Sequence, residues 1–353
     1  MNLDGVERIA EAVLYEGYML YPYRASAVKN QQRWNFGVLY PRSYSEMQSG
    51  SDAWMMQTEC LLQADASTQL LIEIRFLQIV NRFIGRPAYT LMQLPRSGEP
   101  DLELVDKLVV DGRPFVPWQE AVERKVTIPV FCPIEDSFLR QSTFMFSAER
   151  KMEPIRNHEG IIAGVIVREW EALSGSVEID LKECREGLIQ ATVCLRNLTS
   201  YDSSLSGNRG DALMHSLVSA HTILGAERGR FISLLDPPQD LVELTAKCTN
   251  IGTWPVLVGD REARNGMLSS PIILYDFPQI APESPGSLFD GTEIDEILSL
   301  RILAMTDEEK QEMRQSDERA RQILERTENM PPEHFMNLHG VLRGLRPIDT
   351  EAP

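Results

Sequence analysis

Apolar side chains alternate with polar ones along several segments of the first 200 residues. In 54–62, Met56, Cys60 and Leu62 fall on one side of an extended chain, and Glu59 falls on the other. Successive side chains of a β-strand point to opposite faces of its sheet, so this alternation predicts a strand that buries one face. Similar alternation recurs in 72–76, 144–146, 177–181 and 189–195.

Many short strands separated by polar turns indicate antiparallel sheets that pack face to face. Between 109 and 115, the pair Asp111-Gly112 is typical of a tight hairpin turn, because both residue types tolerate a positive φ. We therefore predict a mainly β chain, α+β overall. An antiparallel β-sandwich or open barrel is expected over 34–200, followed by a helical C-terminal region.

The hydrophobic period changes to that of a helix after residue 291. Thr292 is placed to cap a first helix, and Thr306 with Glu309 forms a capping box that begins a charged helix to about residue 328. Pro331 and Pro332 precede a third helical pattern. We expect these helices to pack beside the sheets and to contribute no strand.

Four regions follow from these patterns. The loop-like stretch 201–211 is either a linker or a long surface loop, so whether the region after it forms a separate domain stays open. The predicted regions are an N-terminal helix with a basic aromatic segment (1–33), the antiparallel β domain (34–200), a second β or irregular region (212–291) and the C-terminal helices (292–353).

The chain is strongly acidic. Its 353 residues include 35 basic and 52 acidic side chains, for a formal net charge of -17. Such a surface repels phosphate, which argues against nucleic acid as a partner. No apolar run approaches the ~20 residues that a membrane-spanning helix needs, and the N-terminus lacks the pattern of a signal peptide. We expect a soluble cytoplasmic protein of undetermined oligomeric state.

Familiar catalytic and metal-binding motifs are missing from the sequence. It contains no GxxxxGK(S/T), no GxGxxG after a strand, no GxSxG and no HExxH. The five cysteines form no CxxC pair, and the five histidines lack the spacing of shared metal ligands. We therefore predict no cofactor and no metal site, name no catalytic residue, and favour a protein that is not an enzyme.

The segment 17–45 contains no carboxylate but several cations and aromatic rings. Arginine, tyrosine and tryptophan dominate the binding energy of protein–protein interfaces. We predict that this segment forms a docking surface for a protein partner. Its predicted contact residues are Tyr21, Tyr23, Arg24, Lys29, Arg33, Trp34 and Arg42.

Two alternatives remain for the same segment. In the first, its cations pair with carboxylates of this protein, and its aromatic rings pack at the edge of the sandwich. In the second, Arg24, Lys29 and Arg33 clamp a small anionic substrate of an enzyme. An enzyme site should be a deep pocket near these cations, whereas a partner surface should be flat and exposed.

Three long stretches resemble an uncharacterised bacterial protein family. They are YEGYMLYPYRASAVKNQQRWNFGVLYP at 15–41, GAERGRFISLLDPPQDL at 225–241 and ILYDFPQIAPESPGSLFDGTEIDEILSLRILAMTDEEKQEMR at 273–314. That family is associated with gene neighbourhoods of nickel–iron hydrogenases of the actinobacterial, high-affinity uptake type. The resemblance implies an accessory, assembly or scaffolding role with a hydrogenase subunit or a maturation factor as partner. It brings no catalytic residue with it.

Overall fold

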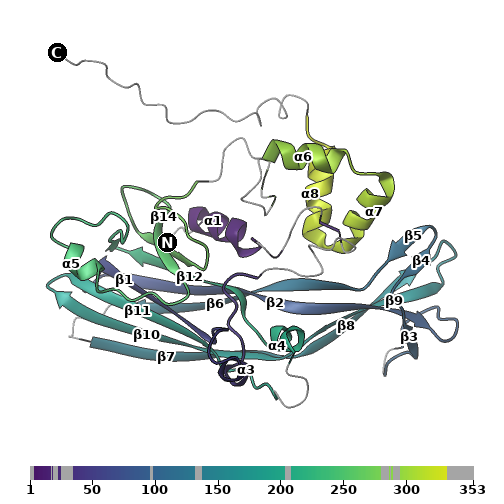
Figure 1. Ribbon diagram of the computed structural model, residues 1–353, viewed down its shortest axis with the longest axis horizontal. Coiled ribbons are helices and arrows are strands. Elements are labelled where there is room, and N and C mark those ends of the chain that lie inside the picture. Colours follow the sequence, from purple (N-terminus) through teal and green to yellow (C-terminus); the bar gives the residue numbers. More distant parts are fainter. Residues whose placement is uncertain are drawn as a thin grey trace.

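The protein is mainly antiparallel β, with 44% strand and 19% helix. This confirms the predicted fold class. A computed structural model describes residues 4–16, 18, 23–24, 35–95, 98–131, 137–202, 208–279, 286, 288 and 295–331. Figure 1 shows two layers of strands with helices above them.

The smaller of the two main sheets has five strands in the order β13-β1-β11-β10-β7. Each neighbouring pair in it is antiparallel, and β1 and β11 pair over the whole length of β1. The predicted strand at 54–62 is therefore present as β1. The bounds are β1 (Met55–Gln63), β7 (Ser137–Phe146), β10 (Leu173–Arg185), β11 (Leu188–Asn197) and β13 (Arg230–Phe231).

The larger sheet has the order β14-β15-β12-β2-β9-β8, and β3 and β6 also pair with β2. Its central strand β2 pairs with β6 along one side, and with β12 and then β9 along the other. Every other strand of this sheet is therefore positioned by β2, directly or through a neighbour. The bounds are β2 (Gln69–Pro87), β3 (Leu102–Leu104), β6 (Trp118–Phe131), β8 (Glu149–Arg156), β9 (Ile162–Trp170), β12 (Val218–Glu227), β14 (Trp254–Val258) and β15 (Gly266–Ser270).

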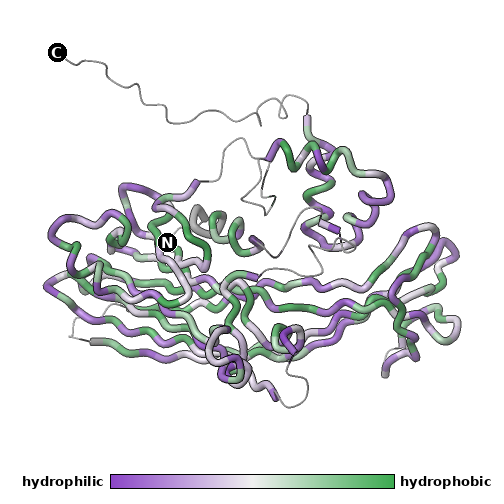
Figure 2. The backbone as a smooth tube through the Cα atoms, viewed as in Figure 1, coloured by the Kyte–Doolittle hydropathy of each residue, from purple (hydrophilic) through white to green (hydrophobic). Residues whose placement is uncertain are grey.

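The two sheets pack face to face around one apolar core. The ring of Phe76 on β2 lies 5.8 Å from that of Phe144 and 5.9 Å from that of Phe146, both on β7. Buried side chains of β1, β10, β11 and β12 complete this core. Along these strands the hydropathy changes from residue to residue, as a half-buried strand requires (Figure 2). The predicted sandwich is confirmed.

A short hairpin stands apart from the two main sheets. It consists of β4 (Leu108–Val110) and β5 (Arg113–Phe115), which pair with each other. At its turn, Asp111 has a φ of 48° and Gly112 a φ of 77°. Two consecutive positive φ angles match the twist of a two-residue hairpin, so the turn predicted at this pair is confirmed.

Strands from the predicted second β region join the larger sheet. β12 follows β2, and β15 and β14 continue outward from it. A bulge interrupts β12, because Val218 lies opposite Leu77 but His221 lies opposite Arg75. At this bulge the backbone of Ser219 bonds to segment 36–39, and Leu39 exchanges two backbone hydrogen bonds with Leu217, of 2.9 and 3.0 Å. Segment 36–39 is thereby fixed to the sandwich.

Helices cover parts of the sandwich. α6, α7 and α8 lie together above the larger sheet (Figure 1), and the described residues 295–331 form no strand, as predicted. No helix among the described residues is both long and apolar enough to cross a membrane. The bounds are α1 (Asp4–Leu14), α3 (Arg42–Met47), α4 (Arg209–Met214), α5 (Val242–Thr245), α6 (Asp295–Leu303), α7 (Asp307–Ser316) and α8 (Glu318–Glu328).

The charged helix predicted from 306 to about 328 is two helices. The capping box of Thr306 and Glu309 begins α7 as predicted. However, Asp317 is extended, with a φ of -147°, and its side chain accepts a hydrogen bond from the backbone N–H of Arg319. An aspartate at this position caps a new helix, so α8 begins there. The predicted cap at Thr292 and the helix after Pro332 lie outside the described residues.

The helices α6–α8, called the helical unit below, are anchored by a second apolar core. Leu298 of α6, Met313 of α7 and Leu324 of α8 are fully buried in it. They share this core with Leu77 and Ile79 of β2. Strand β2 therefore packs against the smaller sheet on one face and against the helical unit on the other.

Candidate partner-binding surface

Three of the seven predicted contact residues fall within the described residues, namely Tyr23, Arg24 and Arg42. Tyr21, Lys29, Arg33 and Trp34 lie outside them. The side chain of Tyr23 is 2% exposed, and its hydroxyl donates a hydrogen bond to the backbone oxygen of Leu288. The backbone oxygen of Tyr23 accepts a hydrogen bond of 2.9 Å from the hydroxyl of Ser316. Tyr23 thus belongs to the interior beside the helical unit, where a partner has no access to it.

Arg24 is paired within the protein. Its Nη1 lies 2.9 Å from Oε1 of Glu309 on α7, and the two side chains are 23% and 33% accessible. This ion pair agrees with the first alternative for the segment, in which its cations pair with carboxylates of the protein itself. Arg42 lies elsewhere, because Figure 1 shows α3 and α7 on opposite sides of the sheets. The three described residues therefore do not form one continuous surface.

Of the three predicted contact residues that the structure describes, Arg42 is the exposed one. It begins α3, its Nε donates a hydrogen bond of 2.8 Å to Oε1 of Glu46, and 63% of its side chain is accessible. Its guanidinium carbon lies 4.9 Å from the ring centroid of Trp54. A guanidinium above an aromatic face is attracted to the ring and held in one orientation.

A second exposed arginine lies beside the first. Arg209 begins α4, and 68% of its side chain is accessible. Its guanidinium carbon lies 5.5 Å from the ring centroid of Tyr40, and its Nη2 lies 3.5 Å from Oδ1 of Asp52. The backbone N–H of Tyr40 donates a 2.8 Å hydrogen bond to the oxygen of Ala53, next to Trp54. This backbone pairing brings the two arginines to one place on the protein.

We call Tyr40, Arg42, Trp54 and Arg209 the arginine–aromatic surface. A row of rings supports it from below, with centroid distances of 5.1 Å from Tyr40 to Tyr44 and 6.1 Å from Tyr44 to Tyr201. Burial raises the pKa of the Tyr40 hydroxyl above its usual value, whereas the charge of Arg209 acts in the opposite direction. The rings are therefore neutral and rigidly packed, and the charge of the surface comes from its arginines.

Buried hydrogen bonds fix the chain segments below this surface. The side-chain amide of Asn197 donates to the backbone oxygens of Leu39, at 2.8 Å, and His215, at 2.9 Å. Ser43 donates through its hydroxyl to the backbone oxygen of Tyr201, at 2.9 Å. Three distant parts of the chain are thus tied together. Asn197 is fully buried, so its amide serves the interior of the protein.

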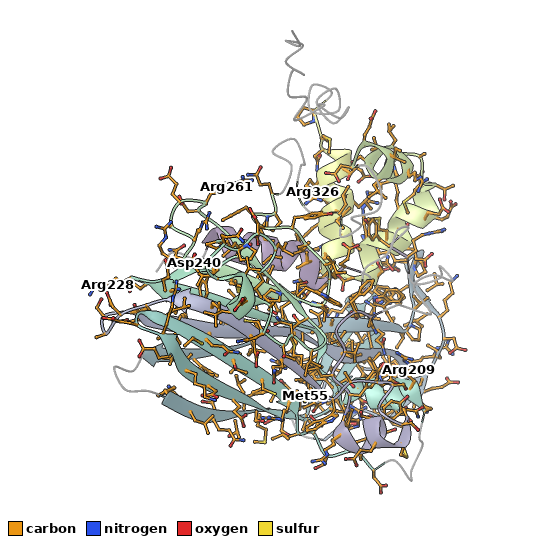
Figure 3. All side chains as sticks on the ribbon, turned by 60° about the vertical axis from the view of Figure 1, so that its left-hand side comes forward. Met55, Arg209, Arg228, Asp240, Arg261 and Arg326 are labelled. Atoms are coloured by element: carbon orange, nitrogen blue, oxygen red, sulfur yellow. The ribbon has the colours of Figure 1, made fainter. Side chains whose placement is uncertain are left out.

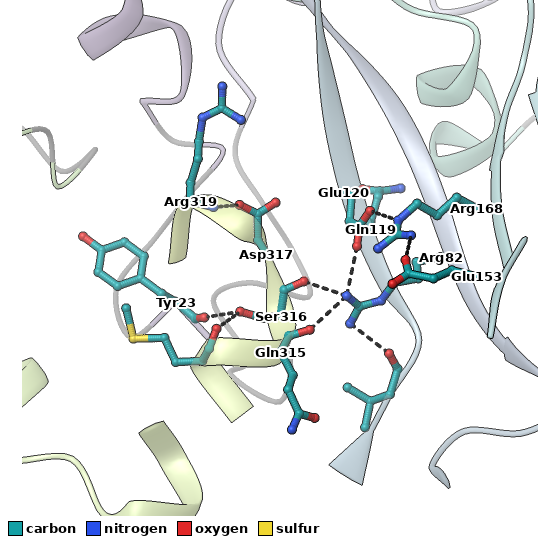
Figure 4. Close-up of polar contacts among 12 residues, drawn as sticks. Tyr23, Arg82, Gln119, Glu120, Glu153, Arg168, Gln315, Ser316, Asp317 and Arg319 are labelled. Atoms are coloured by element: carbon teal, nitrogen blue, oxygen red, sulfur yellow. Dashed lines mark hydrogen bonds and ion pairs between the residues drawn. The ribbon is translucent and has the colours of Figure 1, made fainter. Parts of the chain in front are cut away.

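A network of charged side chains lies between the larger sheet and the helical unit (Figure 4). Nη1 of Arg82 lies 2.9 Å from Oε1 of Glu120 and from the backbone oxygens of Gln315 and Ser316. These are the last carbonyls of α7, at the negative end of the helix dipole. Glu120 also accepts a hydrogen bond from Arg168. Because Arg82 is buried, this network anchors the helical unit and is closed to a ligand.

An open hollow of about 710 Å³ lies at one end of the sandwich. Its charged lining residues are Asp65, Glu227, Arg228 and Arg230, and the rest of the lining is small or uncharged. Figure 3 shows Arg228 and Arg209 on opposite sides of the molecule. The hollow carries equal numbers of cations and carboxylates, and Arg24 does not line it. Among the described residues, no three His, Cys, Asp or Glu side chains are grouped so as to hold a metal ion.

The chain matches no known family model and no curated protein. The arginine–aromatic surface is therefore interpreted from its own chemistry. Each guanidinium presents several N–H donors in a planar fork, which suits the carboxylates of a partner. The segment composition identified Arg42, but Arg209 and Trp54 join it only through the fold, and no local pattern marks either of them.

Proposed function

We propose that the protein is a non-catalytic accessory, assembly or scaffolding protein that acts through protein–protein contacts, and that it docks its partner on the arginine–aromatic surface. The observation that carries this proposal is the pair Arg42 and Arg209, which are both exposed and both held over aromatic rings. Arginine and aromatic residues dominate interface energetics. Side chains that are already ordered lose little entropy on binding, so the affinity per contact is higher.

The partner should present carboxylates at this surface. A guanidinium binds a carboxylate through paired, charge-assisted hydrogen bonds. The net charge of -17 repels most acidic proteins at a distance, so a local pair of cations favours a partner whose acidic groups are positioned to meet it. We propose a hydrogenase subunit or a maturation factor as this partner, and that assignment rests on the sequence resemblance alone.

The alternative of an enzyme with a small anionic substrate has less support. It requires Arg24, Lys29 and Arg33 to clamp the substrate, yet Arg24 already pairs with Glu309. A substrate anion would have to displace that carboxylate from Arg24. Arg42 and Arg209 also pair with carboxylates of this protein, Glu46 and Asp52, but their side chains are 63% and 68% accessible, so a partner's carboxylate can reach their free N–H groups from solvent.

Site-specific photo-crosslinking in the host cell tests the proposal. A photoreactive residue replaces Met47, which is 48% exposed at the end of α3, and a control places it at Leu235, which is 57% exposed elsewhere. We expect one dominant protein adduct from position 47 that is absent from position 235. The adduct should disappear when Arg42→Glu and Arg209→Glu are added. An adduct that persists in this double variant contradicts docking at this surface.

A further inference from the structure

The edge strands of the two sheets differ in how well they are protected against pairing with a strand of another molecule. Unpaired backbone groups on an edge strand recruit other strands, and proteins guard such edges with charges, prolines, short strands or covering segments. β8 ends the larger sheet with the sequence ERKMEPIR, which is rich in charge and contains Pro154. β13 has only 2 residues.

Two further edges are covered by contacts. At β14, the backbone N–H and oxygen of Leu257 bond to the Asp276 carboxylate and the Phe277 N–H, at 2.7 and 2.6 Å. On β6, the hydroxyl of Tyr18 donates to the backbone oxygen of Gln119, at 3.1 Å. β6 also contains a proline, which is tolerated in edge strands because it lacks an N–H.

β7 is less protected than these edges, although the guanidinium of Arg140 donates a hydrogen bond of 2.8 Å to the backbone oxygen of Pro129 on β6. β7 pairs with β10 over all 10 of its residues and ends the smaller sheet. Its sequence SFLRQSTFMF contains no proline, no lysine and no carboxylate, and Arg140 is its one charge. Within the part of the chain that the structure describes, no backbone hydrogen bond reaches β7 from any segment but β10.

Both faces of β7 offer apolar contacts next to its open edge. Phe138, Phe144 and Phe146 are partly buried against the sandwich core. On the opposite face, Leu139 is 70% exposed and Met145 is 74% exposed. A strand added beside β7 would cover apolar side chains with both of its faces, in addition to forming backbone hydrogen bonds.

We propose that the edge of β7 is a strand-addition site for an extended segment of another protein, with apolar residues at alternate positions and a carboxylate opposite Arg140. A second copy of this chain fits the edge poorly. Because β7 has no carboxylate, two β7 strands leave Arg140 without an acidic partner, and each copy also carries a net charge of -17. This site uses none of the arginine–aromatic surface and stands independently of docking there.

Hydrogen exchange with a synthetic peptide tests the site. The probe is an acetylated ten-residue peptide of alternating Val and Thr with one central Asp, which can pair in either strand direction. At saturating peptide, alternate amides of 137–146 should exchange at least tenfold more slowly. The same peptide with an N-methyl group on every backbone amide should give no slowing, because it has no N–H to donate to β7 from either of its edges. Replacing its Asp by Lys should weaken binding.

Variants test whether the slowing of amide exchange by the peptide arises at the edge of β7. The double change Leu139→Lys and Met145→Lys affects exposed side chains, so it should leave the thermal midpoint unchanged and abolish the peptide effect. The matched control, Leu235→Lys with Val242→Lys, also affects exposed residues and should change nothing. The proposal is overturned if millimolar peptide slows no amide of β7, or if the outward amides are already protected in dilute free protein. Protection that grows with protein concentration, without peptide, would show that a second copy occupies the edge and would also overturn it.

Discussion

His221 is a fully buried titratable side chain at the bulge of β12. Its Nδ1 lies 2.7 Å from the backbone oxygen of Ser219, so Nδ1 carries the proton, and Nε2 accepts from the hydroxyl of Ser270 at 3.1 Å. Burial lowers the pKa of His221 from 6.5 to about 4, and the nearby charge of Arg75 acts in the same direction. The neutral imidazole is therefore part of the folded structure.

A pH dependence of stability follows from this histidine. The unfolded chain binds a proton at His221 below pH 6.5, whereas the folded protein resists it down to about pH 4. The contribution of the neutral His221 to the free energy of unfolding is thus fully present above pH 6.5. It is lost as the pH falls toward 4, and ~2 kcal/mol of it is gone at pH 4.5. Urea unfolding of the protein and of His221→Gln should show their stability difference shrinking by that amount between pH 7 and 4.5. A difference that is independent of pH contradicts this account.

The ion pair of Arg24 and Glu309 leads to a second prediction at this scale. Arg24→Glu places two carboxylates together in a partly exposed position, so it should lower the free energy of unfolding by ~1 kcal/mol. Adding Glu309→Arg should recover most of this loss, because the pair is restored with its charges exchanged. Chemical denaturation of the single and double variants measures both effects. Unchanged stability in Arg24→Glu would mean that the pair contributes nothing.

At the scale of elements, the sequence predicted a turn or a helix cap correctly where the residues of that turn or cap determine its structure. The turn at Asp111-Gly112 and the capping box at Thr306 were predicted because their residues act on their own backbone. The break at Asp317 was missed, although aspartate is a capping residue, because the charged helical pattern continues across it. Charge on one face of β2 also misleads, because Glu73 is 2% exposed and its carboxylate lies 2.6 Å from Nζ of Lys125 on the paired strand β6.

Arg82 provides the test of how the helical unit is attached. Arg82→Met leaves Glu120 and the last carbonyls of α7 without this donor in a buried site, so it should cost ~3 kcal/mol of stability. Proteolysis within 295–331 should also become faster. The control is Arg86→Met on the same strand, which is 52% exposed and should cost less than ~0.5 kcal/mol. Equal effects of the two changes would show that Arg82 does not anchor α7.

At the scale of the whole molecule, β2 organises the protein because both of its faces and both of its edges are used. The alternation in sequence predicted the sandwich, yet it did not predict that residues after 212 complete the larger sheet. The candidate surface was also predicted only in part, because it is assembled from distant parts of the sequence. Arg42 lies in a segment of unusual composition, whereas Arg209 and Trp54 reach it from distant positions through the fold.

Metal analysis checks a further expectation for the whole protein. Its cysteines and histidines lack ligand spacing in the sequence, so the purified chain should carry less than ~0.1 equivalents of nickel, zinc or iron after gel filtration. Elemental analysis of protein from the native host measures this directly. About one equivalent of any of these metals per chain would instead favour a metal-delivery role.

The affinity for the partner tests the central claim most directly. Calorimetric titration should compare the unmodified protein with the double variant Arg42→Glu and Arg209→Glu, using the protein identified by crosslinking. The control double variant, Arg185→Glu with Arg321→Glu, changes two arginines that are 48% and 46% exposed and paired elsewhere. We predict a loss of roughly 1,000-fold for the first variant, since two anchoring residues at ~2 kcal/mol each contribute ~4 kcal/mol, and no loss for the control. Equal affinity in all three proteins would contradict docking on the arginine–aromatic surface.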